Sequence, residues 1–214
     1  MYARDAITIQ TWANKSPDNL ARVIQLAIVS AHAPFHRIVT DMADAVDGSE
    51  EAQRAVLFGW KHRAFHDVWA EREAIAWNLA DIRDLAGATR LPDVAWRKAA
   101  ADHALAYLGG FHGLGYAKAG FALQMGLGLS GCLDVHNLRK AGCNPYIIRS
   151  RVKERVTSRT THLRRASEYN RVVETMGGTA GLWDAWCRDM AERNPKRWDT
   201  AEQVSALHCE ALGI

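Results

Sequence analysis

The feature that most constrains this chain is a short glycine-containing turn between two helical patterns. Residues 96–107 carry apolar and aromatic side chains at helical spacing, and residues 116–125 are rich in alanine and large apolar residues. The turn between them is Gly113-Leu-Gly115. Glycines at both ends let the backbone take positive φ and approach a partner closely. The sequence therefore predicts a tight helix–turn–helix unit over residues 96–126.

The second helix of this unit is expected to begin at the turn itself. Its free N–H groups and the positive end of its dipole then point out of the turn, and Lys118 adds a positive charge in the first helical turn. Such a turn suits an anion such as a phosphate. The residues alone fit equally well with a helix corner whose glycines serve only close packing.

Other helices are predicted from caps and apolar periodicity, and no strand pattern is found along the chain. Ser16-Pro17 is a favourable helix start, with a capping hydroxyl before a proline at the first helical position. Further helices are predicted over residues 35–46, 56–86 and 93–107 and, as two or three segments, 167–212.

The residues around the glycine turn resemble a known motif. Residues 111–119, FHGLGYAKA, resemble the helix-hairpin-helix of the base-excision DNA glycosylase superfamily, written as Leu-Pro-Gly-Val-Gly-x-x-x-Ala. In that family a Gly- or Pro-containing loop follows, then an apolar pair and an aspartate, often as Val-Asp-x-His. Residues 127–136, LGLSGCLDVH, have the same order and nearly the same spacing. The match covers about residues 105–139.

The resemblance implies an all-α fold of two helical lobes, with duplex DNA in the cleft between them. One lobe would comprise residues 17–130 and end in the helix-hairpin-helix. The other would combine residues 1–16 with 131–214 and place Asp134 at the cleft. With 214 residues, 48% of them hydrophobic, the chain can bury one core or two smaller ones.

Asp134 matches the position at which the family keeps its acting carboxylate. A carboxylate there can stabilise an oxocarbenium-like sugar or take a proton from a nucleophile. Alternatively, Asp134 simply caps a helix that starts at Val135. Family members that also cut the strand carry a lysine where this chain has Ala117, and Lys118 lies about 100° further around the helix. We therefore expect its amine to point the wrong way for a Schiff base, and we expect no lyase activity.

A basic region follows Asp134. Between residues 139 and 165 there are nine lysines and arginines against one acidic residue, although the net charge of the whole chain is only +3. This pattern predicts a surface for DNA phosphates, and the alternative is a solvated helix balanced by acids elsewhere. The residues expected to bind DNA are Gly113, Gly115, Tyr116 and Lys118 in the hairpin, and Arg139, Arg149, Arg151 and Lys153 after it.

Residues 60–69 hold an unusual group of cationic and histidine side chains. His62 and His66 are four residues apart and share a helical face, and Lys61 and Arg63 flank it. The group suits a phosphate or a proton-transfer role. The same residues also fit a solvated helix face.

Two reactions fit a site of this kind. The first is a monofunctional glycosylase that removes a damaged or modified base. The second belongs to a phage branch of the superfamily named as glutamyl/putrescinyl-thymidine pyrophosphorylases, which the run AKAGFALQ at residues 117–124 resembles. Some members of that branch are amino acid:DNA transferases, which flip a phosphorylated 5-hydroxymethyluracil and replace its phosphate with an amino acid amine.

The transferase needs cations around the leaving phosphate, and the group at residues 61–66 would supply them. We therefore favour the transferase over the glycosylase, and a non-enzymatic DNA-binding module is a third interpretation. Gln124 could read a base edge or could lie in solvent. The expected partners are double-stranded DNA and a free amino acid, and the chain is expected to be a monomer.

The cysteines and the hydropathy set the remaining expectations. The four cysteines, at positions 132, 143, 187 and 209, have no Cys-x-x-Cys spacing, so we expect neither a metal site nor the iron–sulfur cluster of some superfamily members. The resemblance allows a monovalent cation at the hairpin. Reduced thiols, no signal peptide and no apolar run of about 18 residues predict a cytoplasmic protein without a membrane span, in the host cytoplasm if phage-encoded.

Overall fold

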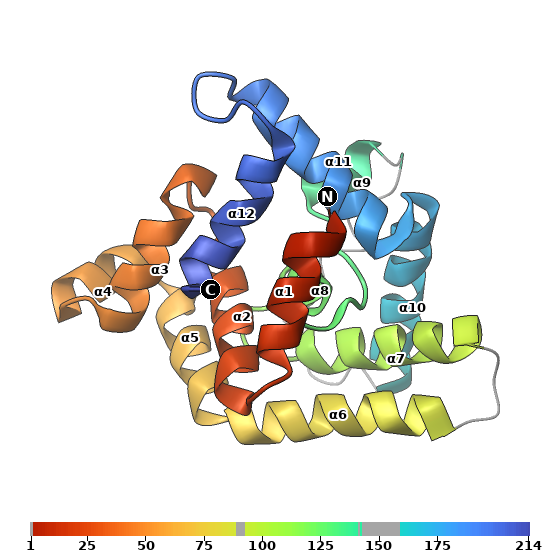
Figure 1. Cartoon of the computed structure of the whole chain (residues 1–214). Helices are drawn as coiled ribbons and strands as arrows, with labels where there is room; N and C mark the ends of the chain where they lie inside the picture. Colours follow the sequence, from red (N-terminus) through yellow and green to blue (C-terminus); the bar gives the residue numbers. More distant parts are fainter. Residues whose placement is uncertain (1, 89–92, 141, 143–158) are drawn as a thin grey trace.

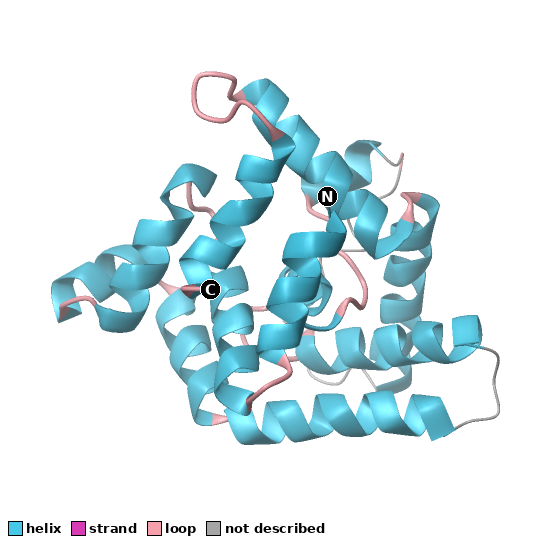
Figure 2. Cartoon of the chain, viewed as in Figure 1, coloured by secondary structure: helices cyan, strands magenta, loops and turns pink. Residues whose placement is uncertain are grey.

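A computed structural model describes residues 2–88, 93–140, 142 and 159–214 of the chain (Figure 1). These residues form helices joined by short turns, and no strand occurs among them, which confirms the predicted all-α class (Figure 2). None of the helices in these ranges is long and apolar enough to cross a membrane. The elements are α1 (Tyr2–Ala13), α2 (Pro17–Val29), the 3-10 helix η1 (Phe35–Arg37), α3 (Ile38–Asp47), α4 (Glu50–Val56), α5 (Trp60–Ala70), α6 (Arg72–Ala88), α7 (Asp93–Leu108), α8 (Gly115–Leu127), α9 (Val135–Lys140), α10 (Arg159–Thr175), α11 (Gly178–Arg193) and α12 (Ala201–Leu212).

Helix α2 lies at the centre of this arrangement. It starts as predicted, because the Ser16 Oγ accepts a hydrogen bond from the Asn19 N–H at 3.1 Å and Pro17 occupies the first helical position. From Leu20 to Val29 every residue except Arg22 is buried. Helices α1, α5, α6 and α8 all pack against it (Figure 1).

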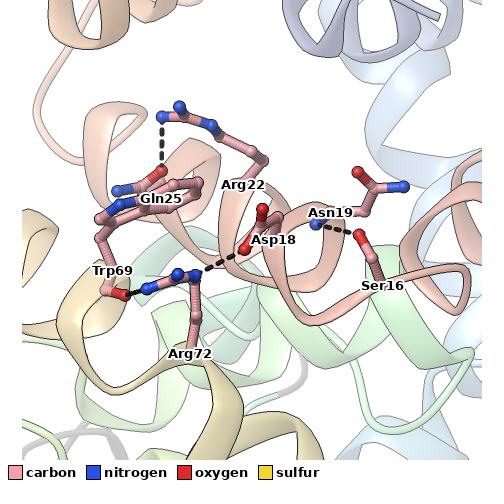
Figure 3. Close-up of polar contacts among 7 residues, drawn as sticks. All are labelled: Ser16, Asp18, Asn19, Arg22, Gln25, Trp69 and Arg72. Atoms are coloured by element: carbon pink, nitrogen blue, oxygen red, sulfur yellow. Dashed lines mark hydrogen bonds and ion pairs between the residues drawn. The ribbon is translucent and has the colours of Figure 1, made fainter.

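Polar contacts tie the first turns of α2 to the junction of α5 and α6 (Figure 3). Asp18 forms an ion pair with Arg72, whose Nη1 also donates to the Trp69 carbonyl at 2.9 Å. The Arg22 guanidinium lies 4.2 Å from the centre of the Trp69 ring and donates to the Gln25 side chain at 3.0 Å. These contacts hold the start of α2 against the junction of α5 and α6.

The predicted single helical stretch over residues 56–86 is wrong in its continuity. The chain leaves α4 at Leu57, turns at Gly59 with φ +61°, and forms α5 and α6 as separate helices on either side of Glu71. A residue with positive φ cannot continue a right-handed helix. The spacing of apolar residues did not reveal this turn, because the turn is shorter than one turn of helix and barely interrupts that spacing.

The predicted glycine turn is present between α7 and α8. Gly113 and Gly115 both have positive φ, +80° and +55°, and α8 begins at Gly115 as expected. A Cβ at Gly113 would collide with the Trp60 ring and come within 3.3 Å of the Ala64 Cβ, whereas a Cβ at Gly115 would meet open space. The turn therefore lies directly against the first turns of α5.

One hydrophobic core joins the two predicted lobes. Ile9 and Leu133 belong to the same buried cluster as Leu26 and Leu123, and so does Val204 in the last helix. The division of the chain into one lobe of residues 17–130 and a second of residues 1–16 with 131–214 stays a prediction.

The two hairpin glycines provide a matched test of this packing. Gly113→Ala should destabilise the protein by about 3 kcal/mol, since it combines a left-handed backbone with a collision against Trp60. Gly115→Ala has only the backbone cost, about 1 kcal/mol. Urea unfolding of both variants would measure the difference, and equal losses would contradict the close approach of the turn to α5.

Candidate functional site

A pocket of about 250 Å³ lies beside α8, between the end of α2 and helices α9, α11 and α12. Its lining combines charged, polar and aromatic side chains. The lining includes Ser30, Lys118, Phe121, Gln124, Cys132, Asp134, Asn137, Trp183, Trp186 and His208.

Asp134 stands at the start of α9 and lines the pocket. Its Oδ1 accepts a hydrogen bond from the Asn137 N–H at 2.7 Å, and its carbonyl accepts from the Leu138 N–H at 3.0 Å. Asp134 therefore caps α9, which was the alternative drawn from the residues alone. The carboxylate is only partly buried, so a cap through one oxygen and a role in the pocket are compatible.

Lys118 lines the same pocket as Asp134, and the expected absence of lyase activity stays a prediction. The amine donates to the Ser30 Oγ at 3.0 Å, which places it at the C-terminal end of α2. The 100° rotation around α8 turns the side chain toward that helix end, which itself borders the pocket. Burial lowers the pKa of Lys118, and the neighbouring charges of Cys132 and Asp134 oppose this shift.

Two opposite charges thus line one small pocket without neutralising each other directly. Among the described residues, no ion pair joins Lys118 to Asp134. Each group keeps hydrogen-bonding capacity for a ligand, because the ammonium has three donors and the carboxylate has two oxygens.

Aromatic side chains also line the pocket. The Trp183 and Trp186 rings stack at 5.6 Å between centroids with 29° between their planes, and Phe121 stacks on Trp183 at 6.2 Å. Trp183 is only 2% exposed. Both tryptophan rings line the pocket, and because Trp183 has almost no exposed surface, the half-buried Trp186 is the ring that can stack on a planar ligand.

His208 is a pocket residue that the sequence did not indicate. It lies inside this aromatic group, 4.6 Å from the Trp183 ring centroid, and burial lowers its pKa to about 4. Its Nδ1 lies 3.4 Å from the Ser205 carbonyl, which can only accept, so Nδ1 carries the proton and Nε2 is an acceptor. A lone histidine at helical spacing carries no sequence signal for such a position.

Two further predicted site residues have structural partners instead. Both ends of the Gln124 amide bind backbone, the nitrogen donating to the Thr179 carbonyl at 2.7 Å and the oxygen accepting from the Cys132 N–H at 3.0 Å. Tyr116 is fully buried and donates to the His162 carbonyl at 3.0 Å, and burial raises its pKa to about 12. A DNA contact by the buried Tyr116 side chain is therefore wrong, whereas base reading by Gln124, which lines the pocket, stays a prediction.

The group at residues 61–66 does not form a phosphate site around Asp134, because none of its members lines the pocket. Lys61 is 1% exposed and donates to the Val29 carbonyl at 2.9 Å. His62 and His66 share an exposed face with their ring centroids 4.5 Å apart, and Arg63 forms an ion pair with Asp67. The physical reason is helical geometry, since consecutive residues are rotated by about 100° and cannot share one face.

Of the remaining predicted DNA contacts, Gly113 and Arg139 are exposed and Gly115 is half-buried. Arg149, Arg151 and Lys153 lie outside the described residues. The described residues contain no group of three or more histidine, cysteine, aspartate or glutamate side chains that could hold a metal ion. A monovalent cation at the hairpin stays a prediction.

Comparisons with protein-family models, with curated proteins and with solved structures found no match to this chain. The resemblance to the helix-hairpin-helix glycosylases therefore stays a prediction carried by residues 105–139.

The buried His208 predicts a specific acid sensitivity. Its folded pKa of about 4 lies below the unfolded value of about 6.5, so the unfolded chain binds the extra proton first and stability falls as pH drops from about 6.5 to about 4. This loss amounts to about 3 kcal/mol at pH 4. His208→Phe should remove it, and urea unfolding of both proteins from pH 7 to pH 4 measures it. Parallel pH curves would show that the imidazole is solvated.

Proposed function

We propose that this protein binds duplex DNA through its hairpin and modifies one flipped-out pyrimidine in the pocket, as an amino acid:DNA transferase. The substrate would be the phosphate ester of 5-hydroxymethyluracil in DNA, and the co-substrate a free amino acid. The observation that carries the proposal is the presence of Lys118 and Asp134 together in one pocket with an aromatic wall. The proposal includes a DNA-binding cleft between two lobes, a monomeric state and a cytoplasmic location.

The pocket suits one flipped base. Its volume of about 250 Å³ lies just below the usual range of about 300–1,000 Å³ for small-molecule sites, so a single ring with a small substituent would fill it. Flipping costs a few kcal/mol, and stacking on an aromatic side chain returns about 1–3 kcal/mol per base. Trp186, which is half-buried and lines the pocket, offers such a surface.

The residues support a displacement at the methylene carbon of the base. The amine nitrogen of the amino acid attacks this carbon, and the bond from the carbon to the phosphate oxygen breaks with its electron pair leaving on the phosphate. Asp134 accepts the proton that the amine loses. Lys118, as ammonium, would stabilise the charge that builds on the departing phosphate, and this cation replaces the one expected from residues 61–66.

A monofunctional DNA glycosylase is the second candidate, favoured by the small volume of the pocket and by Asp134 at its edge. Asp134 could stabilise an oxocarbenium-like sugar there. The ammonium of Lys118 would raise the energy of that cation, whereas it would lower the energy of a leaving phosphate. Because the charge of Lys118 opposes the glycosylase reaction and assists the departure of phosphate, the transferase is favoured.

A nucleoside digest with mass spectrometry tests the proposed reaction. Duplex DNA with thymine, 5-hydroxymethyluracil or its phosphate ester would be incubated with pooled amino acids and the wild-type protein. We expect a heavier nucleoside only from the phosphate ester. Asp134→Asn, which keeps a good helix cap, should slow its formation about 10²–10⁴-fold, and Lys118→Met about 10²–10³-fold.

Lys98→Met is the matched control, because Lys98 lies on α7, pairs with Asp102 and does not line this pocket. It should leave the rate within a factor of about 2, as expected for a half-exposed surface pair. Free base and abasic sites would instead identify a glycosylase. Unchanged nucleosides, with DNA binding that weakens steeply with salt, would leave a binding module.

A further inference from the structure

Two lysine amines converge on the C-terminal end of α2. Lys61 from α5 donates to the carbonyl of Val29, the last residue of the helix, at 2.9 Å. Lys118 from α8 donates to the Oγ of Ser30, the next residue, at 3.0 Å. Both amines therefore lie at the negative end of the same helix dipole, and one of them lines the pocket.

The burial of Lys61 is unusual for a charged side chain. It is 1% exposed, and buried lysines ordinarily have a carboxylate partner. No described carboxylate forms an ion pair with it, and Asp41, whose charge raises the pKa of Lys61, pairs with Arg37 at 3.0 Å. The centre of the Phe58 ring lies 4.7 Å from the Lys61 amine.

We propose that Lys61 is a positioning residue for Lys118: it holds the end of α2 that carries Ser30, and the Lys118 amine placed there makes the pocket a binding site for a phosphomonoester dianion. This deepens the proposed function, since the dianion would be the phosphate of the flipped base. Binding of free phosphate, however, requires neither DNA nor catalysis and can be measured separately.

The electrostatics agree with this role. Burial lowers the pKa of both lysines, and the charge of Lys118 lowers the pKa of Lys61 further. Cys132 and Asp134 act in the opposite direction on Lys118, as Asp41 does on Lys61, while burial keeps His208 neutral at pH 7. Excess positive charge of this kind, away from water, favours a ligand with two negative charges over one with a single charge.

A purely structural role for Lys61 is the alternative, and the chain offers a control for it. Gln25 is also 1% exposed, and its Nε2 donates from α2 to the Phe65 carbonyl of α5 at 3.0 Å. Gln25 thus joins the same two helices by a side-chain to backbone hydrogen bond, but its donor is uncharged and lies on α2 instead of α5. Gln25→Leu removes this bond as Lys61→Met removes the other.

The test is binding of inorganic phosphate to the full chain, followed by tryptophan fluorescence because Trp183 and Trp186 line the pocket. Wild-type protein should bind phosphate saturably. The binding should weaken as the pH rises through the pKa of Lys118, because the amine then loses its charge. Lys61→Met should weaken binding about tenfold at pH 7 and move the alkaline loss about one pH unit higher, since Lys118 loses its like-charged neighbour. Gln25→Leu should lower the midpoint of thermal unfolding but change neither the phosphate affinity nor the pH at which phosphate binding is lost.

Two results would overturn the inference. If Lys61→Met matched Gln25→Leu in phosphate affinity and in its alkaline limit, Lys61 would be only structural. If wild-type protein did not bind phosphate, the dianion site itself would be wrong. Phosphate binding with the expected response to Lys61→Met, but without the modified nucleoside, would support the lysine pair and contradict the transferase.

Discussion

The buried body of α2 is the constraint on which the position of the pocket depends. Its apolar residues exclude water from Leu20 to Val29, so the helices around it must present apolar faces to it. Helix α8 is one of them, and it carries both the hairpin turn and Lys118. Because α2 ends where α8 begins, one helix end gathers groups from α5 and α8 and forms one side of the pocket.

The pocket brings together two charged groups, each of which would lose free energy of hydration if it were buried alone. A lysine out of water loses hydration, and a partly buried carboxylate loses some of its own. Placing Lys118 and Asp134 in the same cavity reduces both costs, and leaving them unpaired keeps each available to a ligand. A ligand with an anionic group, a transferable proton and a planar ring matches these three features together.

Much of the fold could be predicted from the sequence, because the signals are local. The cap at Ser16, the glycine turn and the cap at Asp134 each depend on residues within one helical turn. The site was harder to predict. Lys118 was assigned a direction from its neighbours on α8, whereas the end of α2, almost ninety residues earlier, determines where its amine lies. His208 enters the pocket only through the packing of α12, which no local pattern reports.

The most direct test of the central claim is a crystal structure of the Asp134→Asn variant with duplex DNA that contains the phosphate ester of 5-hydroxymethyluracil. We predict that the modified base leaves the helix, stacks against Trp186, and places its phosphate within hydrogen-bond distance of the Lys118 amine. A complex in which every base stays stacked in the duplex, with this pocket turned away from the DNA, would contradict it.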